Sequence, residues 1–147
     1  MGEIYRHLQE RCEGQIGNEE THSHTVTDVH VTLSSPSNAE WREITTNIVA
    51  TLYIDFKRIR KVDEYVYYWT LQDYLRPNKF GHLSNKIYNQ GDCKLFRYKN
   101  LSLSTHREPM GKGFGRRIDP KVMKSWIYPA PRSGDELILK TVCALKK

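Results

Sequence analysis

The stretch VDEYVYYWTLQDYL, residues 62–75, constrains the fold more than any other part of this sequence. Its side chains alternate between two faces, and most of them are aromatic or β-branched, as is typical of strands. Tyr65 and Trp69 project from one face, whereas Val66 and Tyr68 project from the other. Because bulky side chains occupy both faces, the pattern predicts a strand in the interior of a sheet.

A second alternating stretch, HTVTDVHVTLS, spans residues 24–34. Val31 and Leu33 lie on an apolar face, whereas His30 and Thr32 lie on a polar face. This pattern predicts a strand that is buried on one side and exposed to water on the other.

The segment after Pro36 has the spacing of a helix. The letters SNAE at 37–40 match a capping box, in which a serine hydroxyl and a glutamate carboxylate satisfy the first backbone N–H groups. Apolar residues then recur at helical spacing: Trp41, Ile44, Ile48 and Leu52. The pattern predicts a long helix over residues 38–56, held mainly by packing because its β-branched residues lower helix propensity.

The remaining segments predict a loop, further strands and one short helix. Residues 76–92 are polar and predict a long loop, and residues 93–104 predict one or two strands. DPKVMKSWIY, residues 119–128, has a capping aspartate followed by proline and predicts a short helix. DELILKTVCALKK, residues 135–147, alternates and predicts a final strand, with Leu137 and Leu139 on one face.

The order of these elements indicates the fold class. Strands and helices do not alternate strictly, so the sequence predicts an α+β domain with a mainly antiparallel sheet. One long and one short helix are expected to pack against that sheet. Residues 1–23 are polar and weakly patterned, and predict a flexible N-terminal arm. Residues 24–147 are then expected to form a single domain.

The cysteines and histidines do not suggest a metal or a cofactor. The cysteines are odd in number, widely spaced and without a CxxC pair: Cys12, Cys93 and Cys143. This usage predicts free or buried thiols in a reducing compartment. The N-terminus has no apolar signal-peptide core, and no apolar run approaches the roughly 20 residues that cross a membrane. We therefore expect a protein that is not secreted and that meets membranes only peripherally.

The letters HVTL raise the question of catalysis. His30 and Thr32 are two residues apart on a strand and share one face, as in the His-x-Thr unit of two-histidine phosphoesterases. That chemistry needs a second unit, and the candidate, His82-Leu83-Ser84, has no strand pattern. The simpler interpretation is an exposed histidine on a polar strand face, with no catalytic residue. The alternative is a phosphoesterase or RNA-binding module that uses His30, Thr32 and His82.

Positive charge is the other functional signal. The formal net charge is +6, which favours an anionic partner such as nucleic acid or a membrane surface. Cations gather in two clusters, the second with an aromatic residue between them: Lys57, Arg58, Arg60 and Lys61, and then Lys112, Phe114, Arg116 and Arg117. Such clusters can bind anionic lipid or RNA. The simpler interpretation is a solvated helix end and a charged loop.

The succession TDVHVTLSS, SNAEWREITTNIVATLYIDF and EYVYYWTLQDYL, followed by a late basic loop, resembles the matrix proteins of rhabdoviruses, including plant-infecting members. The resemblance covers residues 24–104. It implies a non-enzymatic structural protein that binds the viral nucleocapsid or RNA, attaches peripherally to an anionic membrane surface and self-associates. It also implies a location in the virion and the host cytoplasm, with the two basic clusters as contact sites.

Overall fold

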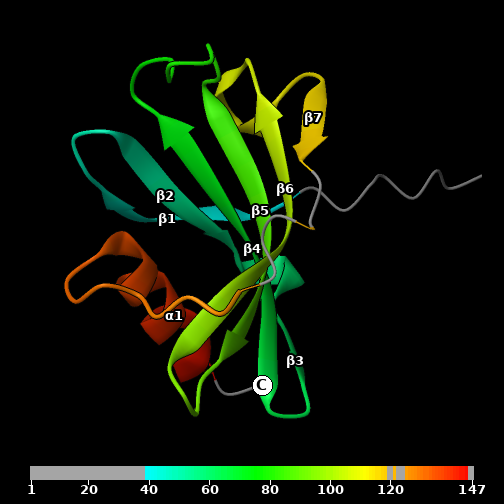
Figure 1. Cartoon of the computed structure of the whole chain (residues 1–147), viewed down its shortest axis with the longest axis vertical. Helices are drawn as coiled ribbons and strands as arrows, with labels where there is room; N and C mark the ends of the chain where they lie inside the picture. Colours follow the sequence, from blue (N-terminus) through cyan, green and yellow to red (C-terminus); the bar gives the residue numbers. More distant parts are fainter. Residues whose placement is uncertain (1–38, 119–120, 122–124, 146–147) are drawn as a thin grey trace, which may run out of the picture. The chain divides into compact units, whose positions relative to one another are not determined.

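The computed structural model describes residues 39–118, 121 and 125–145, which belong to one compact unit of the chain (Figure 1). Within these residues, seven strands and one α-helix follow in the order β1 (Trp41–Thr46), β2 (Ala50–Asp55), β3 (Arg60–Val62), β4 (Tyr65–Tyr74), β5 (Ser84–Asp92), β6 (Arg97–His106), β7 (Gly115–Ile118) and α1 (Gly134–Ala144). Two short 3₁₀ segments lie between strands: η1 (Phe56–Arg58) and η2 (Pro109–Gly111).

The strands form one antiparallel sheet in the order β1-β2-β4-β5-β6-β7, and β3 pairs with β4 next to β2. The predicted strand over residues 62–75 is confirmed as β4, which pairs with β2, β3 and β5 and therefore lies in the interior of the sheet. The α+β class and the antiparallel sheet are also confirmed. The expected pair of helices is wrong, because the described residues hold a single α-helix.

A hairpin of β1 and β2 occupies the place of the predicted helix over residues 38–56, so that prediction is wrong for the described residues. Asn47 makes the turn, because its side-chain oxygen accepts hydrogen bonds from the backbone N–H groups of Val49 (2.8 Å) and Ala50 (2.9 Å). Ile48 at the tip is 96% exposed, although the helical stripe placed it in the core. The β-branched residues of this segment favour strands, and that preference outweighs an accidental helical spacing.

Strand β5 occupies most of the predicted loop over residues 76–92. Its sequence, SNKIYNQGD, has few apolar residues, so a search for apolar alternation does not find it. The strand is nevertheless an interior one, paired with β4 on one edge and β6 on the other. Two of its amide groups donate to neighbouring hydroxyls, Asn89 to Thr70 (3.0 Å) and Asn85 to Tyr74 (2.8 Å).

The predicted strand over residues 135–147 is wrong, because this segment forms helix α1. Ser133 caps the helix by accepting a hydrogen bond from the backbone N–H of Glu136 (3.1 Å). The buried residues recur at helical spacing: Ile138, Leu139 and Val142. Leu137, which the strand pattern placed on the face of Leu139, is 43% exposed, whereas Leu139 is fully buried. A helical period explains this difference and an alternating period does not.

Several predictions concern parts of the chain that the structure does not describe. The following lie outside the described residues: the arm over 1–23, the strand over 24–34 with His30 and Thr32, Ser37 of the predicted capping box, and Cys12. The predicted short helix over 119–128 lies partly outside them as well. Its described residues 125–128 are not helical, and Ile127 forms an isolated bridge with Tyr98.

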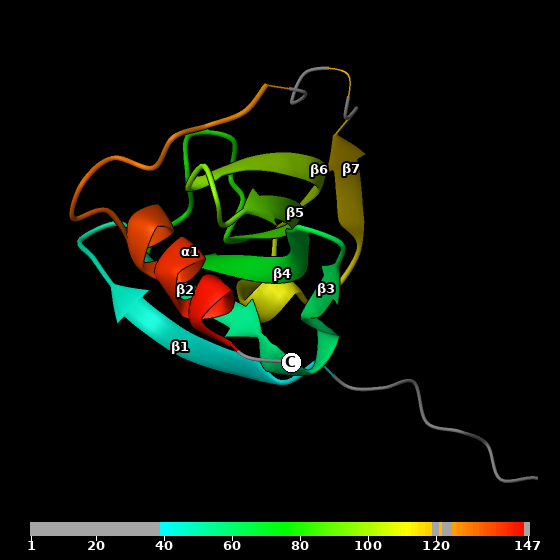
Figure 2. The same ribbon diagram turned by 90° about the horizontal axis from the view of Figure 1, so that it is seen from below.

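The core lies between α1 and one face of the sheet, which we call the covered face. Figure 2 shows the helix in the hollow of the curved sheet, alongside β1, β2 and β4. Buried side chains from both sides meet there: Leu52, Ile54, Val66, Tyr68, Ile138, Leu139 and Val142. Gly91 of β5 allows this close approach, because a Cβ atom there would lie 2.9 Å from the Leu139 side chain and 2.9 Å from that of Val66.

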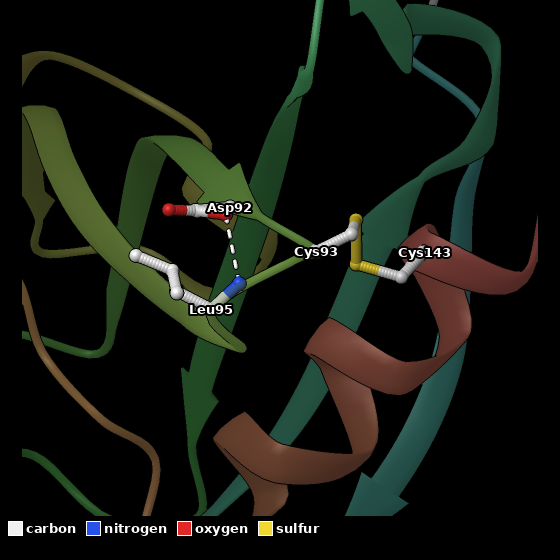
Figure 3. The surroundings of a disulfide bond; sticks show 4 residues. All are labelled: Asp92, Cys93, Leu95 and Cys143. Carbon is white, nitrogen blue, oxygen red and sulfur yellow. Dashed lines mark hydrogen bonds between the residues drawn. A yellow bond between two sulfur atoms is a disulfide. The ribbon is translucent and has the colours of Figure 1, made fainter.

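A disulfide between Cys93 and Cys143 joins the turn after β5 to the last turn of α1 (Figure 3). Beside it, the backbone N–H of Leu95 donates to the Asp92 carboxylate (3.0 Å), which shapes the turn that carries Cys93. The prediction of free thiols in a reducing compartment is therefore wrong for these two cysteines. They are 50 residues apart in sequence, and only the folded sheet and helix bring them together.

Candidate functional site

The sheet face opposite α1 is divided into two parts. At one end η2 packs against β4 and β5, and Leu71 of β4 is fully buried there. The backbone N–H of Met110 donates to the Asp73 carboxylate (2.6 Å), and that of Gly111 donates to the Ser84 hydroxyl (2.9 Å). These bonds hold the loop after β6 on the sheet, so this end of the opposite face is closed.

The other end of the opposite face carries a group of half-buried aromatic side chains, which we call the aromatic face: Tyr65, Tyr67, Trp69, Tyr88 and Trp126. The Trp69 and Tyr88 rings stack at 5.0 Å between centroids, and the Tyr67 ring lies 6.3 Å from that of Tyr88. Trp126 stacks on Tyr65 at 6.0 Å. The planes of the two stacked pairs differ by 25° and 29°, whereas the Tyr67 and Tyr88 rings are tilted by 32°.

Strand alternation and register place these rings together. Tyr65, Tyr67 and Trp69 are two residues apart on β4 and therefore share one face. Tyr88 of β5 is directly opposite Trp69 in the antiparallel register, which puts both rings on the same side. Trp126 arrives from a different part of the chain, next to Ile127, whose backbone exchanges hydrogen bonds of 2.9 and 2.7 Å with Tyr98 of β6.

Arg58 lies over Trp69, at one end of the aromatic face. Its guanidinium carbon is 5.4 Å from the Trp69 ring centroid and 5.9 Å from that of Trp41 on β1. The guanidinium forms an ion pair with Asp55, which is fully buried. Because Asp55 also accepts from the backbone N–H groups of Glu40 (3.1 Å) and of Lys57 (3.2 Å), Arg58 is fixed by a rigid anchor.

Two further cations lie against Trp126. The Arg97 guanidinium carbon is 4.4 Å and the Lys99 ammonium nitrogen 4.7 Å from its ring centroid. Arg97 is held by Asp92 (3.0 Å), whose pKa is lowered by the hydrogen bond from the Leu95 backbone and by the Arg97 charge. The carboxylate therefore stays ionised, and it holds the guanidinium near the Trp126 ring.

Three cations of this surface form no ion pair with any described residue: Arg60, Lys86 and Lys99. Arg60 is opposite Tyr67 in the β3–β4 register and therefore lies on the aromatic face. Lys86 precedes Tyr88 by two residues on β5 and shares the same side of the sheet, where its side chain lies against Gly111 of η2 at the border of the closed end. Burial, and then the nearby Arg58 charge, lower the pKa of Lys86. The surface thus has positive charge that its own carboxylates do not neutralise.

This arrangement is suited to binding rather than to proton or group transfer. Tryptophan, tyrosine and arginine contribute most of the free energy in protein binding surfaces, because they bring large contact areas and directional polar groups. Rings held in a row by strand register, with guanidinium groups stacked on them, keep their shape before a partner arrives. Such preorganisation lowers the entropy that binding costs.

A second candidate lies on the covered face, where α1 leaves part of the sheet uncovered. A cavity of about 390 Å³ opens between the start of α1 and the sheet. Side-chain amides dominate its polar lining: Asn47, Gln72, Asn89 and Asn100. On the same part of the sheet, the buried Asn85 side-chain oxygen has no hydrogen-bond partner among the described residues. We call this cavity the amide cleft.

The structure separates the residues of the first predicted basic cluster. Arg58 and Arg60 lie on the aromatic face, as described above. Lys57 instead approaches the Glu40 carboxylate (3.7 Å). Lys61 is opposite Val66 in the β3–β4 register, so it projects to the other side of the sheet from Arg60.

The second predicted cluster is also divided. Arg116 and Arg117 are neighbours on β7 and point to opposite sides of the sheet. Phe114 is 93% exposed in the preceding loop. The Lys112 carbonyl accepts a hydrogen bond from Nδ1 of the buried His106 (3.0 Å).

The described part of the fold gives no geometric support to the phosphoesterase hypothesis. His82 lies in the loop between β4 and β5, where its backbone N–H donates to the Asn78 side chain (3.0 Å) and its ring lies 6.3 Å from that of Phe80. His30 and Thr32 lie outside the described residues. Among the described residues no cluster of histidine, cysteine and carboxylate side chains has the arrangement of metal ligands. In the same part of the chain, no helix has the length and apolarity needed to cross a membrane.

Sequence reasoning did not identify Tyr88, Lys99 and Trp126 as parts of a site. Tyr88 fell in a predicted loop and Trp126 in a predicted helix. The available signal was weak: Ile87 and Tyr88 are two strand-favouring residues within an otherwise polar segment. Trp126 had no such signal, because its place depends on a bridge to β6.

Comparison with known proteins gives one family and one fold. The family model described as surface-adhesin protein E matches residues 41–144. Two crystal structures of protein E from Haemophilus influenzae are similar to this chain, with TM-scores of 0.54 and 0.53. Each is 18% identical over 76% of this chain, and the match covers 94% and 91% of the respective structure. A search of curated proteins found no match.

These findings overturn the viral interpretation. The resemblance to rhabdovirus matrix proteins is wrong, because the family match covers β1 to α1 and belongs to surface adhesins. The expected nucleocapsid, RNA and anionic-membrane partners, the self-association and the location in virion and host cytoplasm are wrong with it. The phosphoesterase and RNA-binding alternative built on His30, Thr32 and His82 is overturned by the same match. The chain belongs to the surface-adhesin protein E family.

Proposed function

We propose that this chain is a bacterial surface adhesin that binds a host extracellular partner through the aromatic face. Membership in the surface-adhesin protein E family supports the first half of the proposal. The observation that carries the second half is the row of stacked rings with Arg58 at one end and Arg97 and Lys99 at the other.

The disulfide supports a role outside the cytoplasm. Disulfides persist in oxidising environments and are rare where cellular thiol systems keep cysteines reduced. The bond between Cys93 and Cys143 fixes the end of α1 to the sheet. A protein exposed at a cell surface benefits from such a constraint, since its folded state must survive without cytoplasmic chaperones.

The two predicted basic clusters contribute unequally to the proposed surface. Arg58 and Arg60 belong to it because they share the side of the sheet with Trp69 and Tyr67. Phe114 lies in the loop before β7 and projects into solvent. Substitution at Phe114 therefore distinguishes the aromatic face from the second basic cluster as the adhesive surface.

The test is adherence of a non-adherent bacterium that displays the full chain to cultured human epithelial cells. We expect Trp69→Ala and Tyr88→Ala each to lower the number of adherent bacteria by about tenfold, because each removes a ring with its stacking partner. Phe80→Ala is the matched control, since it removes an exposed ring from the loop between β4 and β5. Phe114→Ala should also leave adherence unchanged.

Surface display and the thermal unfolding midpoint of each variant must match the wild type for the comparison to count. Adherence that survives both Trp69→Ala and Tyr88→Ala, but is lost in Phe114→Ala, would place the adhesive surface on the second basic cluster. Absence of adherence by the displayed wild-type chain would refute the proposed function itself.

A further inference from the structure

The aromatic face lies on interior strands, and this position limits the classes of ligand that it can bind. Peptides commonly bind a sheet by adding a strand to a free edge. Here β4 and β5 are paired on both edges, so their backbone groups are already used. A ligand on this face meets side chains only, and these are ring faces and cationic groups.

Ring faces of this kind suit the apolar face of a sugar. The face of an aromatic ring is electron-rich, and the C–H groups on one side of a pyranose ring carry partial positive charge. Tyr65, Tyr67 and Trp69 follow one another along β4, so consecutive sugar units of a chain can rest on consecutive rings. Trp69 and Tyr88 are the closest pair of rings on this face, stacked with their centroids 5.0 Å apart.

The cations add a requirement for negative charge on the ligand. Arg60, Lys86 and Lys99 form no ion pair with any described residue. Arg58 and Arg97 are paired with carboxylates through Nε, and their guanidinium groups carry further N–H donors at either end. A guanidinium offers paired N–H donors that match the oxygens of a sulfate or a carboxylate. The cations are spread along the row of aromatic rings. They therefore match a sugar chain that carries sulfates better than one that carries only carboxylates, because the latter has fewer charges per sugar unit.

We infer that the aromatic face binds a sulfated polysaccharide, with sugar rings stacked on Tyr67, Trp69 and Tyr88 and sulfates held by the flanking arginines and lysines. This inference rests on the proposed function and specifies its ligand class. The combination of a row of aromatic rings with cations that form no ion pair among the described residues carries it, because neither rings alone nor cations alone distinguish a sulfated glycan from other partners.

Binding of the full chain to a heparin-derived octasaccharide tests the inference by titration calorimetry. Two other probes are the same octasaccharide after chemical desulfation, which keeps its carboxylates, and a single-stranded RNA of matched charge. We expect binding of the sulfated probe, at least a tenfold loss on desulfation, and weaker binding of the RNA. Trp69→Ala should weaken binding by about tenfold, which corresponds to the free energy of one aromatic contact.

Matched lysine variants separate local recognition from net charge. Lys99→Ala and Lys79→Ala each remove one positive charge. Lys79, however, lies in the loop between β4 and β5, at the opposite end of β4 from Tyr65. We expect Lys99→Ala to weaken binding several-fold and Lys79→Ala to have little effect. Equal effects of the two variants, equal binding of the desulfated probe, or tighter binding of the RNA would each overturn the inference.

A second experiment separates this inference from the proposed function. Adherence is measured on epithelial cells from which heparinase has removed heparan sulfate. Loss of adherence supports the glycan as ligand. Adherence that persists after digestion but is abolished by Trp69→Ala would overturn the glycan and leave the proposed function intact. Adherence that is insensitive to both treatments would overturn both.

Discussion

Cys93 and Cys143 are joined across the covered face, with their Cα atoms 5.6 Å apart, so α1 is fixed at its last turn to the turn between β5 and β6. Ser133 caps the other end of the helix, and the buried residue Leu139 lies between these two points. An 11-residue helix is marginal by itself in water. Its stability here therefore comes from packing, from the cap and from the disulfide.

Removing the disulfide should lower the free energy of unfolding by about 4 kcal/mol, because its 50-residue separation restricts the unfolded chain. We expect this loss for Cys93→Ser/Cys143→Ser, measured by urea unfolding in a Cys12→Ser background that prevents thiol exchange. The disulfide-intact Cys12→Ser chain is the reference. Reduction of that reference should reproduce the double variant, and an unchanged urea midpoint would contradict the constraint.

Gly91→Ala should destabilise the protein by about 1–3 kcal/mol, because a methyl group there overlaps the Leu139 and Val66 side chains. The penalty should shrink in a Leu139→Ala background, which opens space at the point of overlap. Leu137→Ala is the matched background, since Leu137 is on the exposed side of the same helix. Equal penalties in both backgrounds, by denaturant unfolding, would show that Gly91 does not set the approach of α1.

Some sequence patterns of this chain predict the observed elements, and others do not. Strand β4 is predictable because both of its faces are bulky, so only an interior strand can bury them. The β1–β2 hairpin is not predictable in this way, because Ile44, Ile48 and Leu52 have helical spacing by accident. The decisive residue is Asn47, whose side chain makes the turn, and an asparagine within an apolar stripe is a weak signal in sequence alone.

Three of the five rings of the aromatic face could also be predicted to share one side of the sheet. The common face of Tyr65, Tyr67 and Trp69 follows from alternation. Their partners Tyr88 and Trp126 depend on register and on an isolated bridge, which are contacts between distant segments that no local pattern encodes. The helix α1 was missed for the related reason that Leu137 and Leu139 fit an alternating pattern as well as a helical one until the cap at Ser133 is considered.

The stability of the protein should fall as the pH drops below about 6.5, and His106 should be a cause. The side chain is buried, its Nδ1–H donates to the Lys112 carbonyl (3.0 Å), and Nε2 lies 3.0 Å from the Ser104 hydroxyl. Burial lowers the pKa of His106 in the folded state, against the opposing effect of the Lys112 carbonyl. Between the lowered folded value and the unfolded one, the unfolded chain binds more protons, so acid favours unfolding.

His106→Gln separates this contribution from those of other titrating groups. The variant should be less stable than the wild type at about pH 7.5, because it loses a fitted side chain, but the difference should narrow toward about pH 5. Thermal unfolding midpoints measured across this range provide the comparison. Parallel curves for the two proteins would mean that the pKa of His106 is the same in the folded and unfolded states.

Trp126 should be held on the aromatic face chiefly by Arg97. Its ring contacts the guanidinium at 4.4 Å, and Asp92 fixes that group with a 3.0 Å ion pair. In a background where phenylalanine replaces Trp41 and Trp69, Arg97→Ala should shift the Trp126 emission to longer wavelength and increase its quenching by acrylamide. Lys99→Ala is the matched variant, because it removes a cation at 4.7 Å from the same ring but leaves the ion pair of Asp92 intact.

The two variants should therefore differ in a second measurement. Arg97→Ala leaves the buried Asp92 carboxylate with backbone donors alone, so its folded pKa should rise toward the unfolded value; compared with Lys99→Ala, the variant should be less stable near neutral pH and its unfolding midpoint should fall less steeply in acid. The sign follows from the lowered folded pKa, which stabilises the folded state above the unfolded value and loses that effect as the pH falls. Unchanged emission and quenching in Arg97→Ala would show that the ring is held by Tyr65 and the Ile127 bridge, without help from the guanidinium.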